Sequence, residues 1–104
     1  MADEVVIGLP ELTDEQVMEV VEAGERAARD YVLSVLPPKK IYDMGVSIVV
    51  EGTRPLTITV DMELRVASSA RVDPDELARE AAKKAMEAVE AKLRELALAG
   101  RGGA

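Results

Sequence analysis

The most constraining feature of this sequence is the stretch of residues 56–66, in which apolar and polar side chains alternate without a fault. If each position were apolar half of the time, chance would give this pattern roughly once in a thousand sequences. Successive side chains of a β-strand point to opposite faces, so the pattern predicts a strand with one buried face. The apolar positions are Leu56, Ile58, Val60, Met62, Leu64 and Val66.

A second alternating stretch begins at Ile41 and predicts the other strand of a hairpin. The apolar side chains of every second residue from Tyr42 to Val50 share one face. The sequence Gly-Thr-Arg-Pro at residues 52–55 predicts the turn between the two strands. Gly45 interrupts the first strand, where a glycine most simply indicates a bulge or a bend.

A first amphipathic helix is expected between the N-terminal segment and the hairpin. Thr13 and Gln16 form a capping box, so the helix should begin at Asp14. It should end near Leu36, because Pro37–Pro38 cannot continue it. Its apolar stripe consists of Val17, Val20, Val21, Gly24, Ala28, Tyr31 and Val35.

A second amphipathic helix is expected after the hairpin. Asp73 and Pro74 suit the N-cap and the first helical position. Gly100 indicates the end of this helix and the start of a flexible tail over residues 100–104. Pairs of opposite charge at i,i+4 spacing predict weak ion pairs along both helices. These pairs are Glu22–Arg26, Glu25–Arg29, Glu80–Lys84 and Glu90–Arg94, and the apolar stripe of the second helix is Ala78, Ala82, Ala85, Met86, Val89, Leu93 and Leu96.

The order of these elements predicts an α+β fold with two layers. With a short strand at Val5–Leu9 the order is β-α-β-β-α, an antiparallel hairpin sheet with two helices packed on one face. Residues 1–104 are the size of a single domain. A two-stranded sheet is marginal alone, so the N-terminal strand should join it, and the free edge of the sheet is a natural docking place. We therefore expect a homodimer or a hetero-complex with other protein subunits.

Composition removes the usual residues of catalysis and metal binding. The chain has no Cys and no His, which excludes a cysteine nucleophile and removes the commonest metal ligands and the commonest general base. We expect no enzymatic activity, no cofactor and no metal site. Phe and Trp are absent as well, so the core should be aliphatic. An acidic start and the lack of a long apolar run predict an unprocessed, soluble, cytoplasmic protein that does not enter membranes.

The polar face of the second strand is the first candidate for a functional surface. Asp61 and Glu63 could act in acid–base chemistry or hold a hard cation, and Asp43 and Glu51 would share their face. A solvated sheet face is the plainer interpretation. The candidate interface on this face consists of Thr57, Thr59, Asp61, Glu63 and Arg65.

Two leucines of the first helix widen its apolar surface beyond what one sheet face needs. Leu33 falls among charged residues and Leu36 flanks the stripe. Partner contact and ordinary scatter explain them equally well, because single exposed apolar residues are common.

A small basic end is the candidate for contact with RNA. Lys39 and Lys40 precede the hairpin and Arg54 lies in its turn. The net charge of −7 opposes a protein whose main task is binding nucleic acid, and no DNA binding is expected. Interleaved aromatic residues and a Gly-x-x-Gly loop, which are signatures of RNA-binding domains, are also missing. An RNA-binding module is therefore the alternative hypothesis, ranked after the assembly role.

Two motifs carry a resemblance to a known family. IGLPELTDE at residues 7–15 and VDPDEL at residues 72–77 resemble an uncharacterised family of small archaeal proteins, over nearly the whole chain. Genes of that family often lie near those of the prefoldin beta subunit, small ribosomal and RNA polymerase subunits, and KEOPS components, which implies a role in information processing. The layout is also similar to the small dimerising subunit of KEOPS, a transfer-RNA modification complex, in which that subunit bridges catalytic subunits. This likeness implies an assembly role and assigns no functional residues.

Overall fold

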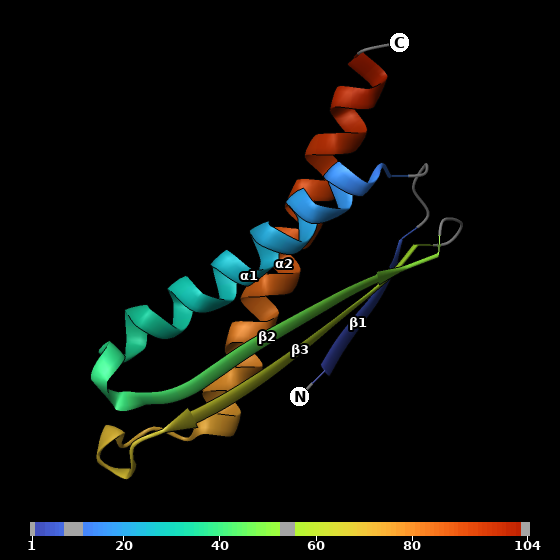
Figure 1. The fold of residues 1–104 in the computed structure, drawn as a ribbon. Coiled ribbons are helices and arrows are strands. Elements are labelled where there is room, and N and C mark those ends of the chain that lie inside the picture. The colour runs from blue at the N-terminus through green and yellow to red at the C-terminus, as the bar shows by residue number, and fades with distance from the viewer. Residues whose placement is uncertain (1, 8–11, 53–55, 103–104) are drawn as a thin grey trace.

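The computed structural model describes residues 2–7, 12–52 and 56–102, and within them the chain forms a sheet and two long helices (Figure 1). The predicted α+β class and the β-α-β-β-α order are confirmed. The strands are β1 (Ala2–Ile7), β2 (Ile41–Glu51) and β3 (Leu56–Val66), the helices are α1 (Asp14–Val35) and α2 (Pro74–Gly102), and two short 3-10 turns are η1 (Pro38–Lys40) and η2 (Ser68–Ala70).

The described strands form one antiparallel sheet in the order β1-β3-β2. The predicted N-terminal strand is confirmed for its residues 5–7, with Val5 opposite Ile58, while Gly8 and Leu9 lie outside the described residues. The central strand is therefore β3, the strand with the faultless alternation. Within the described residues β2 pairs only with β3, so its other edge has no partner strand.

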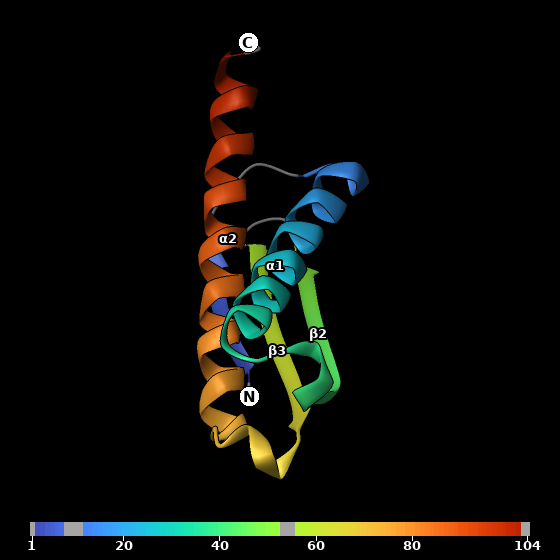
Figure 2. The same cartoon turned by 90° about the vertical axis from the view of Figure 1, so that its left-hand side faces the viewer.

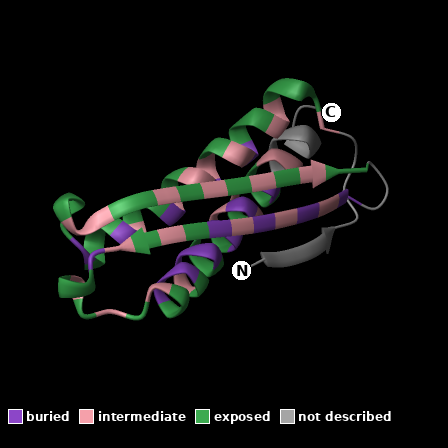
Figure 3. Ribbon diagram, turned by 60° about the horizontal axis from the view of Figure 1, so that its bottom comes forward, coloured by how far each residue is buried: buried purple, intermediate pink, exposed green. Residues whose placement is uncertain are grey.

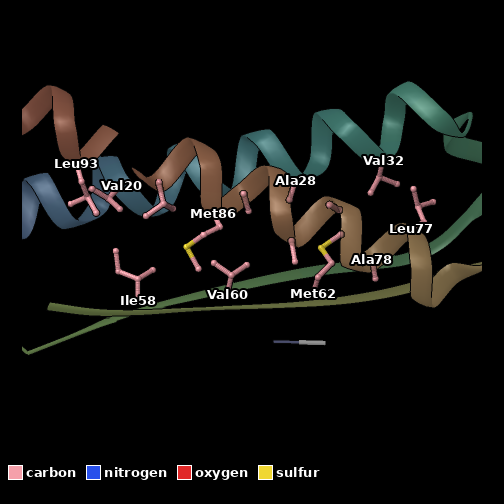
Figure 4. Close-up of a cluster of buried hydrophobic side chains, with 14 of the residues drawn as sticks. Val20, Ala28, Val32, Ile58, Val60, Met62, Leu77, Ala78, Met86 and Leu93 are labelled. Atoms are coloured by element: carbon pink, nitrogen blue, oxygen red, sulfur yellow. The ribbon is translucent and has the colours of Figure 1, made fainter. Parts of the chain in front are cut away.

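Both helices cover the same face of the sheet. Figure 2 shows α2 along one side and α1 crossing diagonally toward β2, with the N-terminal turns of α1 extending past that strand. The core lies between the two layers and is aliphatic, as Figure 4 shows. Burial of about 25 cal/mol per Å² of apolar surface is the main stabilising contribution to such a core. Its completely buried members include Val20, Ala28, Val32, Ile58, Val60, Ala81, Ala82, Ala85 and Val89.

The hairpin strands alternate in burial as predicted (Figure 3), with one correction near the start of β2. Ile41 is opposite Val66 and Asp43 is opposite Arg65, so Tyr42 is an extra, bulged residue. The predicted placement of Tyr42 on the core-facing side is wrong, since it is 66% exposed. A bulge inserts one unpaired residue and changes the face of the residues before it.

Gly45 does not form the bulge that its presence suggested. It pairs with Glu63 in regular register. A Cβ at Gly45 would only reach ordinary van der Waals distance, 4.0 Å from Cβ of Glu63. The irregularity of β2 therefore belongs to the strand entrance, where the chain leaves η1.

The buried stripe of α1 follows i+4 steps through Val20, Gly24, Ala28 and Val32. Each step of four residues turns the stripe by about 40°, so it winds around a helix that crosses the sheet diagonally. At the C-terminal end the stripe consequently reaches Leu36, which is only 5% exposed. The assignment of Leu36 to a flanking interface is corrected, because this residue belongs to the core. Two further predictions change with it: Val35 is exposed and Val32 is buried.

The predicted caps are present at both helix starts. The Thr13 hydroxyl accepts a hydrogen bond from the Gln16 N–H at 3.1 Å, and the Gln16 side chain accepts one from the Thr13 N–H at 2.9 Å. Asp73 accepts hydrogen bonds from the N–H groups of the first turn of α2, the nearer at 3.0 Å. The predicted stop at Gly100 is wrong, since α2 continues to Gly102. The last part of the expected tail, residues 103–104, lies outside the described residues.

Candidate functional site

The five polar residues predicted on one face of β3 do share the open face of the sheet, away from the helices. Their burial decreases along the strand, from half-buried threonines to exposed Glu63 and Arg65. The register brings Asp43 opposite Arg65 and Glu51 opposite Thr57, so the predicted sharing of this face by both strands is confirmed. The open face is thus mixed in charge, with Ser47, Val49 and Gly45 in its middle rows.

The carboxylates of Asp61 and Glu63 lie on this open face, where Asp61 is half-buried and Glu63 is exposed. Glu63 and Arg65 line a shallow groove of about 390 Å³ that also involves Pro74 and Ala78 of α2. Asp61 does not line it. Within residues 2–7, 12–52 and 56–102 no group of three or more acidic, His or Cys side chains could hold a metal ion.

A second groove, of about 350 Å³, lies between α1 and the start of α2. Tyr31 and Val35 form one wall, and Val72 and Glu80 belong to the other. The Lys84 ammonium stands 5.9 Å from the centre of the Tyr31 ring, a cation–π distance that ties the two helices together. This groove brings together residues that sequence reasoning had not grouped.

Exposed apolar side chains mark the outer side of α1 and the open face of β2. Leu33, a predicted interface residue, is 41% exposed, and Met18 on the same helix is 61% exposed. Val49 on β2 is 42% exposed, although its neighbours Ser47 and Glu51 are polar. Sequence alternation could have found Val49, because it is the one large apolar residue at a polar position of β2.

The predicted basic end is described only in part, through Lys39 and Lys40 of η1. Lys39 is exposed, and the Lys40 ammonium donates a hydrogen bond to the Ser69 hydroxyl at 2.7 Å. Arg54 lies outside the described residues, and Gly52, the last described residue before it, follows the end of β2 that is far from Lys40. The eleven residues of β2 separate these ends by about 36 Å. The basic end formed by Lys39, Lys40 and Arg54 therefore stays a prediction.

The unpaired edge of β2 lacks the features that usually protect a strand edge. Residues 44–50 contain no charge and no Pro, and Asp43 and Glu51 stand only at the ends of this stretch. Natural sheets block their edges with Lys, Pro, bulges or very short strands. On β2 the bulge at Tyr42 interrupts only the first residues. The rest of the edge can accept another extended chain.

An antiparallel sheet with two helices on one face defines the molecule as a small α+β domain with an open sheet surface. The chain belongs to the family described as "Protein of unknown function (DUF3194)", whose model matches residues 9–92. An uncharacterised protein of Thermococcus kodakarensis is 38% identical over 91 residues, covering 88% of this chain and 84% of that protein. One of Pyrococcus horikoshii is 34% identical over 91 residues, or 88% and 78% of the two chains.

Two solved structures are similar in fold. A crystal structure from Thermococcus onnurineus NA1 has a TM-score of 0.72 and 35% identity, covering 93% of this chain and 96% of that one. The solution structure of a hypothetical protein of Methanothermobacter thermautotrophicus has a TM-score of 0.71 and 25% identity, covering 86% and 97%. The predicted family of small archaeal proteins is confirmed, whereas the KEOPS likeness and the gene neighbourhood gain no support from these comparisons.

No helix in the described part of the chain combines the length and the apolar character needed to cross a membrane.

Proposed function

We propose that this protein is a non-enzymatic subunit that assembles with other protein chains. The observation that carries the proposal is the free edge of β2, a long strand whose central stretch 44–50 has no charge. Strand addition to such an edge gives affinity through backbone hydrogen bonds. The absence of Cys and His from the sequence fits a role without chemistry.

A position beside a transfer-RNA modification complex is the narrower form of this proposal. Its support is the likeness of layout to the small KEOPS subunit, which bridges other subunits and does no chemistry. No observation on the described residues favours the RNA-binding alternative: Lys39 and Lys40 lie in η1, and Arg54 lies outside the described residues.

Affinity purification of the tagged full chain from the cells that produce it tests the proposal. We compare the wild type with Val49→Lys, on the edge strand, and with Thr59→Lys, at the position directly opposite on the central strand. Loss of a stoichiometric protein partner, or of a second copy, with Val49→Lys and not with Thr59→Lys is the expected result. Recovery of the wild type alone and monomeric would overturn the proposal.

The same purification decides the narrower form. Recovery of KEOPS subunits with the wild type supports it, and their absence from an otherwise intact complex contradicts it.

A further inference from the structure

The charges of α1 are arranged in a pattern that another copy of the same helix would complement. Going along the helix, Met18 is followed by Glu22 and Glu25, then by Arg26 and Arg29, and finally by Leu33. All six are exposed except Glu25, which is half-buried. The pattern is therefore apolar, acidic, acidic, basic, basic, apolar.

These four charges do not satisfy one another within the helix. Of the four predicted i,i+4 pairs, the described residues form only Glu90–Arg94, at 3.8 Å. No ion pair joins Glu22 to Arg26 or Glu25 to Arg29 in this part of the chain. The stripe thus presents unpaired charges of both signs to its surroundings.

The stripe faces away from α2. Tyr31 marks the side of α1 that meets α2, since it lies beneath Lys84. Glu22 is about 180° around the helix from Tyr31, and Arg29 and Leu33 are each about 160° from it. Figure 2 shows that this direction leads past the outer edge of β2. A chain that extends the sheet beyond β2 and carries helices on the same face would therefore bring them against this stripe.

We propose that the partner on this side is a second copy of the chain, which makes this inference a specific form of the proposed function. Two copies related by a twofold axis perpendicular to the sheet would pair β2 with β2 in antiparallel fashion. Their α1 helices would then lie antiparallel and side by side. In that arrangement Met18 meets Leu33 of the second copy, and each Glu meets an Arg, as Glu22 with Arg29 and Glu25 with Arg26.

The strand edges agree with the same axis. The middle of the helix pattern adjoins Gly24, which packs directly against Ile48 of β2. An axis at Ile48 places Val46 opposite Val50 of the second copy, and such β-branched pairs stabilise a ladder. An axis at Ser47 would oppose Asp43 and Glu51 twice, and like charges directly opposite each other are destabilising. We therefore assign the axis to Ile48.

Sedimentation equilibrium on two charge variants tests this pairing. Glu22→Arg/Glu25→Arg places four Arg on the stripe, and Arg26→Glu/Arg29→Glu places four Glu there. We expect a wild-type dimer at about 50 µM, within the range of weak specific complexes. Each variant alone should dissociate at least about tenfold more readily, because like charges then meet across the interface. An equimolar mixture of the two variants should restore a dimer of one copy of each.

The matched control is the pair of variants Glu87→Arg/Glu95→Arg and Lys83→Glu/Arg94→Glu, which makes the same kind and number of charge reversals at exposed positions of α2. It should leave the wild-type dimer intact. A monomeric wild type, variants that dimerise unchanged, or a mixture that stays monomeric would each overturn the inference. Circular dichroism establishes that each variant is folded.

A spin label gives a second readout that needs no charge change. The chain has no Cys, so Ser47→Cys and Glu87→Cys each carry a single label. Labels at residue 47 should broaden each other strongly, because residue 47 lies opposite Val49 of the second copy, two residues from that copy's own label, on a strand about 4.8 Å away. Labels at residue 87 should not broaden each other. A sharp spectrum at residue 47 contradicts the pairing. A monomer that still recovers a different protein in the affinity purification overturns this inference and leaves the proposed function standing.

Discussion

Gly24 of α1 lies so close to Ile48 of β2 that a Cβ on Gly24 would collide with Cδ1 of Ile48. The same Cβ would be 2.9 Å from Cγ2 of Val89 on α2. Gly24 is thus the point at which the first helix approaches both the sheet and the second helix.

Gly24→Ala should therefore destabilise the protein despite the better helix propensity of Ala. Ala in place of Gly contributes about 1 kcal/mol to a helix, while overpacking costs about 1–3 kcal/mol. We expect a net loss of about 1 kcal/mol in the free energy of unfolding, measured by urea denaturation. Adding Ile48→Val removes Cδ1 and should recover part of the loss through direct coupling. A single variant more stable than the wild type would contradict this account.

Deletion of Tyr42 should be tolerated, because this residue has no place in the ladder between β2 and β3. Removing it leaves Ile41 opposite Val66 and Asp43 opposite Arg65. Deletion of Ser47 is the matched control, since a shift by one residue moves one part of the strand to the wrong face. We expect a melting temperature near that of the wild type for the first deletion and an unfolded chain for the second. Equal damage from both would show that the bulge is required.

Asp73→Ala should destabilise the protein by about 1 kcal/mol, the usual effect of losing an N-cap. The carboxylate of Asp73 accepts hydrogen bonds from the N–H groups of Asp75 and Glu76, and Ala cannot replace it. The measurement is the midpoint of urea unfolding. Ser68→Ala, at an exposed position of η2, serves as a control and should change stability by less than about 0.5 kcal/mol.

Transfer RNA should bind only weakly to the isolated protein. The net charge is −7, and Lys39 and Lys40 stand apart from the far end of the hairpin. Electrophoretic titration with total transfer RNA at physiological salt measures this, with Lys39→Glu/Lys40→Glu as the comparison. We expect no saturable complex in the micromolar range and no effect of the substitutions. Tight binding that the double variant abolishes would support the RNA-binding alternative.

Local signals in the sequence were sufficient for most of the fold. The alternation of Leu56–Val66 predicted the central strand, because a residue's face in a strand depends only on its parity. The capping residues Thr13 and Asp73 predicted both helix starts, since a cap involves only neighbours in the sequence. These predictions depend on contacts within four residues, which a single sequence contains.

The predictions that were wrong concern places where one element of the fold crosses or joins another. A constant helical stripe predicted Val35 in the core, but the diagonal path of α1 buries Val32 and Leu36 instead. A bulge was expected at Gly45, but it occurs at Tyr42, where the chain enters the sheet from η1. The candidate site shows the same division. The alternation in the sequence was enough to predict the open face of β3. The side of α1 that faces away from α2 could be identified only from the packing of the two helices in the structure.

The core has a consequence for how sequences of this kind can diverge. Within the described residues no polar or charged side chain is buried, so no internal hydrogen bond must be preserved when core residues change. A larger aliphatic side chain at one core position can be compensated by a smaller one at a neighbouring position. Substitutions that conserve the total volume in this way are tolerated best. A related chain with 25% identity keeps the fold at a TM-score of 0.71. Substitutions in the core of family members therefore say little about function. Substitutions at strand edges and on outer helix faces are more informative about changes of partner.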